Sequence, residues 1–283
     1  NCNVAALITP EGRNVWFCFP RLDGDPLFHA LLGGADPQRG FMDVMLRDQV
    51  QTRQRYVTNT AVVETVLEDR LGNRLRITDL APRFRRYGRV YRPPALLRRI
   101  VPEQGNPRIA VRIRPGMAYG GVSPQVSLGS NHIRYNGPTD VVRLTTDMPI
   151  SYVLHETEFV LDRPVTLWLG PDEPLPENPD ANARHVLSET IAYWEEWVRG
   201  LNIPFDWQDQ VIRAAITLKL CSYEDTGAIV AALTTSIPEA PGTERNWDYR
   251  FCWIRDAFHT VGALNRLSAT RTMEDFVRFI VNT

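Results

Sequence analysis

The chain has 283 residues, enough for one large domain or two ordinary ones. Hydrophobic residues make up 43% of it and charged residues 23%, as in ordinary soluble globular proteins. The formal net charge of -1 argues against a general attraction to nucleic acid or anionic membranes, and no stretch is long and apolar enough to cross a bilayer.

Cysteine and histidine usage indicates neither a metal site nor a disulfide framework. The four cysteines form no CxxC pair, and the five histidines are scattered without metal-ligand spacing. We therefore expect reduced cysteines, a cytoplasmic protein, and no metal or other cofactor. Lys219 is the only lysine, which we attribute to a GC-rich genome that favours arginine codons.

Residues 1–178 have the pattern of β-structure with an irregular tail. Short apolar runs alternate with turns rich in Gly, Pro, Asn and Asp, such as those at 9–12 and 71–74. Many short strands at this spacing predict a large antiparallel β-sandwich. The expected strands are 4–8, 14–19, 56–67, 74–80, 96–101, 108–114, 122–128, 132–135, 141–146, 151–161 and 165–169.

The pattern changes after residue 169. Four prolines between 170 and 179 predict a linker, because proline fixes φ and removes a backbone donor. Helical spacing of apolar residues then predicts a connecting helix that Gly200 ends and a second helix that Asp206 caps. A loop over 223–250, with room for a short helix at 229–233, precedes a third helix at about 255–267 and a fourth that starts after 272.

These elements predict three parts. They are an antiparallel β-sandwich domain over 1–178, a linker with a connecting helix over 179–203, and the beginning of a larger helical domain over 204–283. Two or three helices cannot bury both faces of a helical domain, so we expect this third part to be incomplete.

The densest group of candidate functional residues is the segment 245–256. It combines three arginines, two aspartates and four aromatic residues in a loop that enters a helix. Charged groups form strong hydrogen bonds with sugar hydroxyls, and flat aromatic rings pack on the apolar faces of pyranoses. Asp256 falls in the first turn of the expected helix, where the helix dipole favours an anion. Composition alone leaves a second interpretation equally open, an Arg–Asp pair over aromatic residues that merely pack beneath a loop.

This segment resembles glycoside hydrolase family 15, which contains glucoamylases, glucodextranases and bacterial trehalases. Members of that family enter an (α/α)6 barrel through a motif of the form WDYR-x-x-W-x-RD, which residues 247–256 match without a gap. The first half resembles the β-sandwich of the trehalase-like bacterial branch, for example in residues 19–21, 31–34 and 54–56. The resemblance covers essentially the whole chain. It implies a β-sandwich followed by the first helices of a truncated (α/α)6 barrel.

The resemblance also implies roles for individual residues. Arg255 and Asp256 would bind the non-reducing glucose in the innermost subsite, where Asp256 would accept hydrogen bonds from outer hydroxyls such as the 4-OH and 6-OH. Tyr249 would lie close to the reacting sugar and the attacking water, and Trp253 would line the same pocket. We interpret the three remaining motif residues as scaffold: Trp247, Asp248 and Arg250. His259, one turn after Arg255, is interpreted as a packed or exposed helix residue.

The family mechanism is inverting and uses two carboxyl groups about 6.5–9.5 Å apart. Both are glutamates in later helical hairpins of the barrel, beyond the position that matches Thr283. We therefore expect no catalytic residue in this chain and no activity from this chain alone. We interpret the acidic residues near the motif as exposed loop charges: Glu224, Asp225, Glu239 and Glu244.

The expected function is that of an inverting, exo-acting α-glucoside hydrolase that releases glucose from non-reducing ends, with trehalose or short malto- and isomalto-oligosaccharides as substrates. The alternative is a non-catalytic carbohydrate-binding or interaction module. The arginine-rich stretch 83–92 includes aromatic residues and allows nucleic-acid binding as a third interpretation, but a solvated loop fits the near-neutral chain better. The expected partner is an α-glucoside, with no nucleic acid and no membrane; a homo-oligomer stays open.

Overall fold

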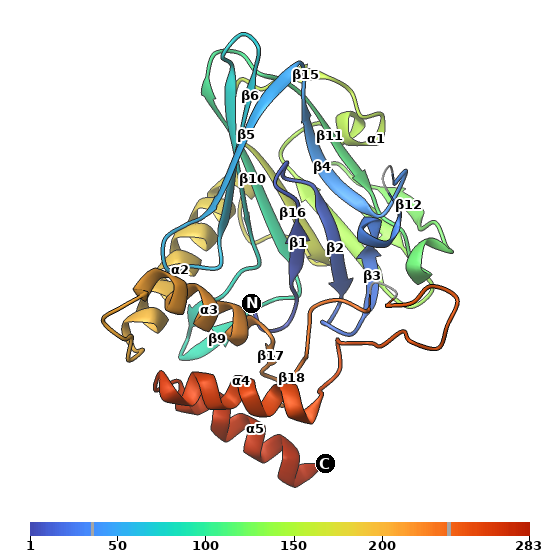
Figure 1. Ribbon diagram of the computed structural model, residues 1–283. Helices are drawn as coiled ribbons and strands as arrows, with labels where there is room; N and C mark the ends of the chain where they lie inside the picture. Colours follow the sequence, from blue (N-terminus) through green and yellow to red (C-terminus); the bar gives the residue numbers. More distant parts are fainter. Residues whose placement is uncertain (35–36, 237–238) are drawn as a thin grey trace.

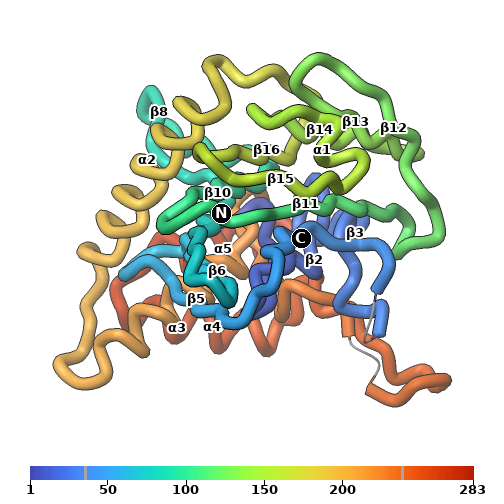
Figure 2. The backbone as a smooth tube through the Cα atoms, turned by 90° about the horizontal axis from the view of Figure 1, so that it is seen from above, coloured from blue at the N-terminus to red at the C-terminus, as the bar shows by residue number. Residues whose placement is uncertain are grey.

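The computed structural model describes residues 1–34, 37–236 and 239–283. Two antiparallel sheets face each other as a β-sandwich, and the longer helices cover one end of it (Figure 1). Seen from above, α2 (Pro179–Arg199) runs along the outside of the sandwich (Figure 2). Within the described ranges, none of the helices has the length and apolarity that crossing a membrane would require.

The first sheet has six strands and the second has eight. The first pairs its strands in the order β1-β2-β4-β11-β15, with β3 beside β2; their bounds are β1 (Ala6–Ile8), β2 (Asn14–Phe19), β3 (Asp25–Phe28), β4 (Phe41–Leu46), β11 (Arg108–Arg114) and β15 (Phe159–Val160). The second follows the order β12-β13-β14-β16-β10-β7-β6-β5; its members are β5 (Gln49–Tyr56), β6 (Val63–Asp69), β7 (Arg74–Leu80), β10 (Leu96–Gln104), β12 (Gln125–Leu128), β13 (His132–Asn136), β14 (Val141–Thr146) and β16 (Val165–Pro171).

The main core lies between the two sheets. On β11, Ile109, Val111 and Ile113 are buried, while the residues between them are half-buried. Leu75 and Ile77 of β7 belong to the same cluster and are fully buried. This alternation is what an antiparallel sheet with one face on the core requires, and each such side chain contributes about 1.5–3 kcal/mol through burial.

Helix α2 begins where the proline-rich stretch ends. The Asn178 side chain accepts a hydrogen bond from the Asp180 backbone N–H at 3.0 Å, and Pro179 stands at the start of the helix. Proline suits that position because its missing N–H would have no intrahelical partner. Trp194 and Val198 face inward, and the helix ends at Gly200, as the sequence predicted.

Three further helices follow α2 in the described residues: α3 (Gln208–Leu220), α4 (Ile254–Arg266) and α5 (Thr270–Asn282). Helices α4 and α5 lie side by side at the end of the sandwich (Figure 1). Ala257 of α4 and Phe276 of α5 form a small core with Ile229, which lies on the short strand β18 (Ala228–Ile229) opposite β17 (Ser222–Tyr223). The expectation of an antiparallel β-sandwich followed by helices is confirmed.

Several elements differ from the sequence prediction. Residues 56–67 are not one strand, because β5 ends at Tyr56 and a turn separates it from β6. Residues 151–161 form the helix α1 (Ile150–Leu154) and then β15, since Pro149 starts a helical turn there. The short helix expected at 229–233 is absent from these described residues, where β18 ends at Ile229. Residues 237–238, in the expected loop, lie outside the described residues.

The cap expected for the second helix is also wrong. Helix α3 begins at Gln208, and the residue before it is Trp207 rather than Asp206. Trp207 has a left-handed backbone with φ 61°, and no side chain caps the helix there.

Candidate functional site

The sandwich holds the motif loop in place. Residues 247–251 run antiparallel to 231–236, with hydrogen bonds from the Ser236 N–H to the Trp247 carbonyl at 2.7 Å and from the Ala232 N–H to the Tyr249 carbonyl at 2.8 Å. The Trp16 indole on β2 donates to the Leu233 carbonyl at 2.7 Å. Residues 231–236 are therefore bonded to the first sheet, and residues 247–251 are attached to it through them.

Arg250 is the main anchor of this loop. It is buried, and its guanidinium donates two hydrogen bonds to the Asp248 carboxylate, of 3.0 and 2.8 Å. The same guanidinium donates to the Gly24 carbonyl at 2.7 Å and to the Tyr119 hydroxyl at 2.5 Å, both on the sandwich. Burial alone would raise the pKa of Asp248, but the hydrogen bonds from Arg250 hold it below its usual range. These contacts engage the side chains of both Arg250 and Asp248 and support the interpretation of the two residues as scaffold.

The aromatic residues of the motif lie against one another. The rings of Tyr249 and Trp253 are 5.7 Å apart, and those of Trp247 and Trp253 are 6.2 Å apart at nearly a right angle. The Trp253 indole donates to the Asp248 carbonyl at 3.1 Å, which fixes the ring on the loop. The structure thus brings together Tyr249 and Trp253, two of the four predicted site residues.

Arg255 and Asp256 occupy the first turn of α4. Their side chains are 80% and 41% exposed, and the nearest guanidinium nitrogen is 3.6 Å from the carboxylate. Within the described residues, the Arg255 side chain makes no hydrogen bond and no other ion pair. The pair is thus open to solvent, in contrast to Arg250 and Asp248. His259 is exposed, with its ring 5.5 Å from that of Phe258.

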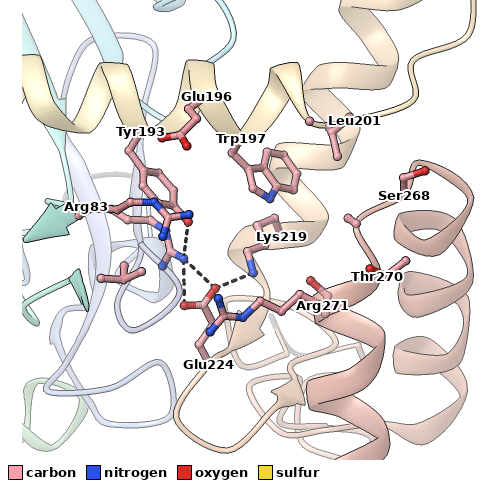
Figure 3. Close-up of a pocket in the computed structure, with 15 residues that line it drawn as sticks. Arg83, Tyr193, Glu196, Trp197, Leu201, Lys219, Glu224, Ser268, Thr270 and Arg271 are labelled. Carbon is pink, nitrogen blue, oxygen red and sulfur yellow. Dashed lines mark hydrogen bonds and ion pairs between the residues drawn. The ribbon is translucent and has the colours of Figure 1, made fainter. Parts of the chain in front are cut away.

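A cavity of about 280 Å³ lies between α2, α3 and the start of α5, and none of the four predicted site residues lines it (Figure 3). The Glu224 carboxylate is the centre of an ion cluster in its wall. It accepts a hydrogen bond from Arg83 at 2.7 Å and pairs with the Lys219 ammonium at 2.5 Å. Burial alone would raise the pKa of Glu224, but Lys219 and Arg83 lower it to about 2. A carboxylate held ionised in this way is unsuited to act as a general acid near neutral pH.

This cluster corrects two sequence interpretations. Glu224 is not an exposed loop charge, because its side chain is only 18% exposed. Arg83 is not part of a solvated loop, because it is fully buried and also donates to the Asn1 carbonyl and the Tyr193 hydroxyl. Asp225, Glu239 and Glu244 are exposed, or largely so, as expected.

Sequence reasoning missed the cluster as a unit. The one signal for the cluster in the sequence was the single lysine. Codon bias explains the many arginines, but it does not explain the lysine at position 219. Lys219 is buried on α3, where a compact ammonium reaches Glu224. No group of three or more histidine, cysteine, aspartate or glutamate side chains within residues 1–34, 37–236 and 239–283 is arranged to hold a metal.

Two family models match the chain. Residues 1–156 match "Trehalase-like, N-terminal", and residues 207–282 match "Glycosyl hydrolases family 15". The chain is 28% identical over 287 residues to a protein named trehalase from Thermoplasma volcanium, a match that covers 98% of this chain and 45% of the relative. It is 29% identical over 302 residues to a trehalase from Mycobacterium tuberculosis, which covers 98% and 44% of the two chains.

A trehalase from Mycolicibacterium smegmatis is 29% identical over 310 residues, covering 100% of this chain and 46% of the relative. The chain thus spans a little under half the length of the curated relatives it matches. No solved structure matches it.

Proposed function

The chain belongs to glycosyl hydrolases family 15, with the trehalase-like amino-terminal domain, and on that premise we propose that the whole protein hydrolyses α-glucosides, with trehalose as the first candidate substrate. The named trehalases among its relatives support this choice of substrate. Maltose and isomaltose are the alternatives that the motif allows.

The observation that carries the proposal is the contrast between the two Arg–Asp pairs of one motif. The Arg250 guanidinium and the Asp248 carboxylate are hydrogen-bonded to each other, and the guanidinium is also bonded to the sandwich. Arg255 and Asp256 stand open in the first turn of α4, which follows directly after Trp253 in the chain. An exposed carboxylate in the first turn of a helix can accept hydrogen bonds from sugar hydroxyls without first losing a protein partner. We therefore assign Arg255, Asp256, Trp253 and Tyr249 to the subsite for a terminal glucose.

The inverting, exo-acting mechanism is part of the proposal. Glu224, the most buried of the four acidic residues near the motif, is held ionised by two cations. We assign neither the general acid nor the general base to the described residues, and the 283 residues by themselves are proposed to be inactive. Inversion requires the attacking water and the leaving oxygen to lie on opposite faces of the sugar ring.

The test is a substrate panel on the full-length protein. Trehalose, maltose, isomaltose and starch are incubated with the enzyme, and the anomers of the released glucose are followed by proton NMR. We expect turnover of trehalose and, for an inverting enzyme, β-glucose as the first anomer formed from the attacked ring. Binding of these sugars without turnover would instead support a carbohydrate-binding module.

A further inference from the structure

A second concave surface lies beside α2. Figures 1 and 2 show α2 on the other side of the molecule from the motif loop. We call this surface the α2 groove. Its walls come from the hairpin of β8 (Phe84–Arg86) and β9 (Arg89–Tyr91), from the stretch after β16, and from α2 itself. The volume is about 710 Å³, within the range typical of small-molecule sites.

The groove gathers charged side chains that form no ion pair within the described chain. The carboxylates of Glu173, Glu177 and Glu189 line it, and within the described chain none of them forms an ion pair or a side-chain hydrogen bond. Arg85 and Arg86 line the same groove and likewise form no ion pair with a described residue. Charges of both signs therefore face one space without neutralising one another.

Two donors at the wall of the groove have no protein partner in the described chain. Asn182, on the first turns of α2, is only 7% exposed, and its amide nitrogen is buried without a partner among the described residues. The Trp168 indole also lines the groove and, in the same part of the chain, donates no hydrogen bond. The Asn182 nitrogen has almost no accessible surface, so a ligand in the groove cannot reach it, whereas the Trp168 indole nitrogen is not among the fully buried atoms. Donors in such a position are normally satisfied, so the indole beside the cavity indicates a missing acceptor.

Aromatic rings form the remaining wall. Phe84 and Tyr91 lie with ring centroids 5.0 Å apart, and Tyr87 at the tip of the hairpin is 91% exposed. The Arg86 guanidinium lies over the Tyr87 ring at 5.4 Å. An exposed tyrosine beside a groove offers a flat apolar face and a hydroxyl to the same ligand.

We propose that the α2 groove binds a neutral oligosaccharide, with Tyr87 and Tyr91 against the pyranose rings and with the Trp168 indole and the three carboxylates bound to hydroxyls. A sugar hydroxyl both donates and accepts, so it can satisfy the indole donor and the carboxylate acceptors together. An anionic ligand fits less well, because the groove has three carboxylates without ion pairs and only two such guanidinium groups. None of Tyr249, Trp253, Arg255 and Asp256 lines this groove, so the inference goes beyond the proposed function.

The test uses the full-length protein with Asp256→Ala, which removes the proposed terminal-glucose contact. Binding of maltotriose is measured by isothermal titration calorimetry in this background. We expect binding to persist, and we expect Tyr87→Ala and Trp168→Phe, which removes the indole donor, each to weaken it roughly fivefold or more. Phe205→Ala is the matched control, because Phe205 is 92% exposed and does not line the groove. It should leave the affinity unchanged.

Two outcomes would overturn the inference. One is the absence of maltotriose binding in the Asp256→Ala background. A triarginine peptide that then binds and depends on Glu173 would assign the groove to a cationic peptide. The other is an affinity that neither Tyr87→Ala nor Trp168→Phe changes. If the wild-type protein has no glucosidase activity, that result counts only against the proposed function. Binding at the groove, measured by calorimetry, does not require turnover.

Discussion

Arg250 donates two hydrogen bonds to the Asp248 carboxylate, and its remaining guanidinium nitrogen donates to the Gly24 carbonyl on the sandwich at 2.7 Å. This arrangement lets a residue in the middle of the motif fasten the whole loop to the β-sheet. The next Arg–Asp pair, five to eight residues further on, has no such attachment in the described chain. The two pairs should therefore respond differently to substitution.

Arg250→Met should destabilise the fold. It leaves Asp248 half-buried without its cation and frees the Gly24 carbonyl, which should lower the free energy of unfolding by about 3 kcal/mol. Urea unfolding followed by circular dichroism measures this change. Arg255→Met is the matched control, because its side chain is 80% exposed, and it should stay within about 0.5 kcal/mol of the parent. Equal losses for both variants would refute the division of roles.

Asp256→Ala should have the opposite profile. It removes the proposed acceptor for sugar hydroxyls and should lower kcat/KM for trehalose by about 10²-fold or more in the full-length protein. Stability should hardly change, because the carboxylate is 41% exposed and its closest ion-pair contact is 3.6 Å long. Asp206→Ala is the control, since Asp206 is exposed and caps no helix. Near-normal turnover by Asp256→Ala would contradict the site assignment.

Local patterns in the sequence predict much of the fold and fail for identifiable reasons. The alternation in β11 and the apolar spacing of α2 are visible because each has one buried face. Strand β5 was largely missed because nearly all of its residues are exposed, so no alternation marks it. Residues 151–161 have strand-like composition, yet Pro149 and local packing start a helix there.

The candidate site was predictable for a different reason. Residues 247–256 are contiguous, so a resemblance can identify them together. Arg83 and Glu224 are 141 positions apart, and only the packing of α2 and α3 against the sandwich brings them into one cluster. No local pattern contains that information. The division into parts at residues 178 and 203 remains a prediction.

The Glu224 cluster predicts a specific acid sensitivity. The pKa of Glu224 falls from 4.5 to about 2 in the folded chain, so the unfolded state binds the proton more readily. Its stabilisation is complete above pH 4.5 and is lost as the pH falls toward 2, by about 3 kcal/mol in total. Urea unfolding at a series of pH values between 2 and 6 measures this slope.

Glu224→Gln should remove that part of the pH dependence and lower stability at pH 7. The exposed Glu244→Gln is the control and should keep the full acid loss. Lys219→Met should shrink the effect without abolishing it, because Arg83 still contacts the carboxylate at 2.7 and 2.9 Å. A slope that is the same in all three variants would show that other groups cause the acid loss.

Trp207 predicts a stabilising substitution. It precedes α3 with φ 61°, a left-handed conformation that costs a bulky residue roughly 1–2 kcal/mol, and its side chain is 75% exposed. Trp207→Gly removes that cost and loses little packing, but it also makes the unfolded chain more flexible. The net gain should be about 0.5 kcal/mol, seen as a higher urea midpoint.

Phe205→Gly is the control, because Phe205 is also exposed but is not among the residues with positive φ. Without strain to relieve, glycine there should lower stability by about 0.5–1 kcal/mol through the unfolded state alone. The sign of the difference between the two variants therefore tests the backbone geometry and not the loss of an aromatic ring. If Trp207→Gly is destabilising by as much as Phe205→Gly, the left-handed turn stores no strain, and Trp207 must gain its energy from a contact that covers it in the full-length protein.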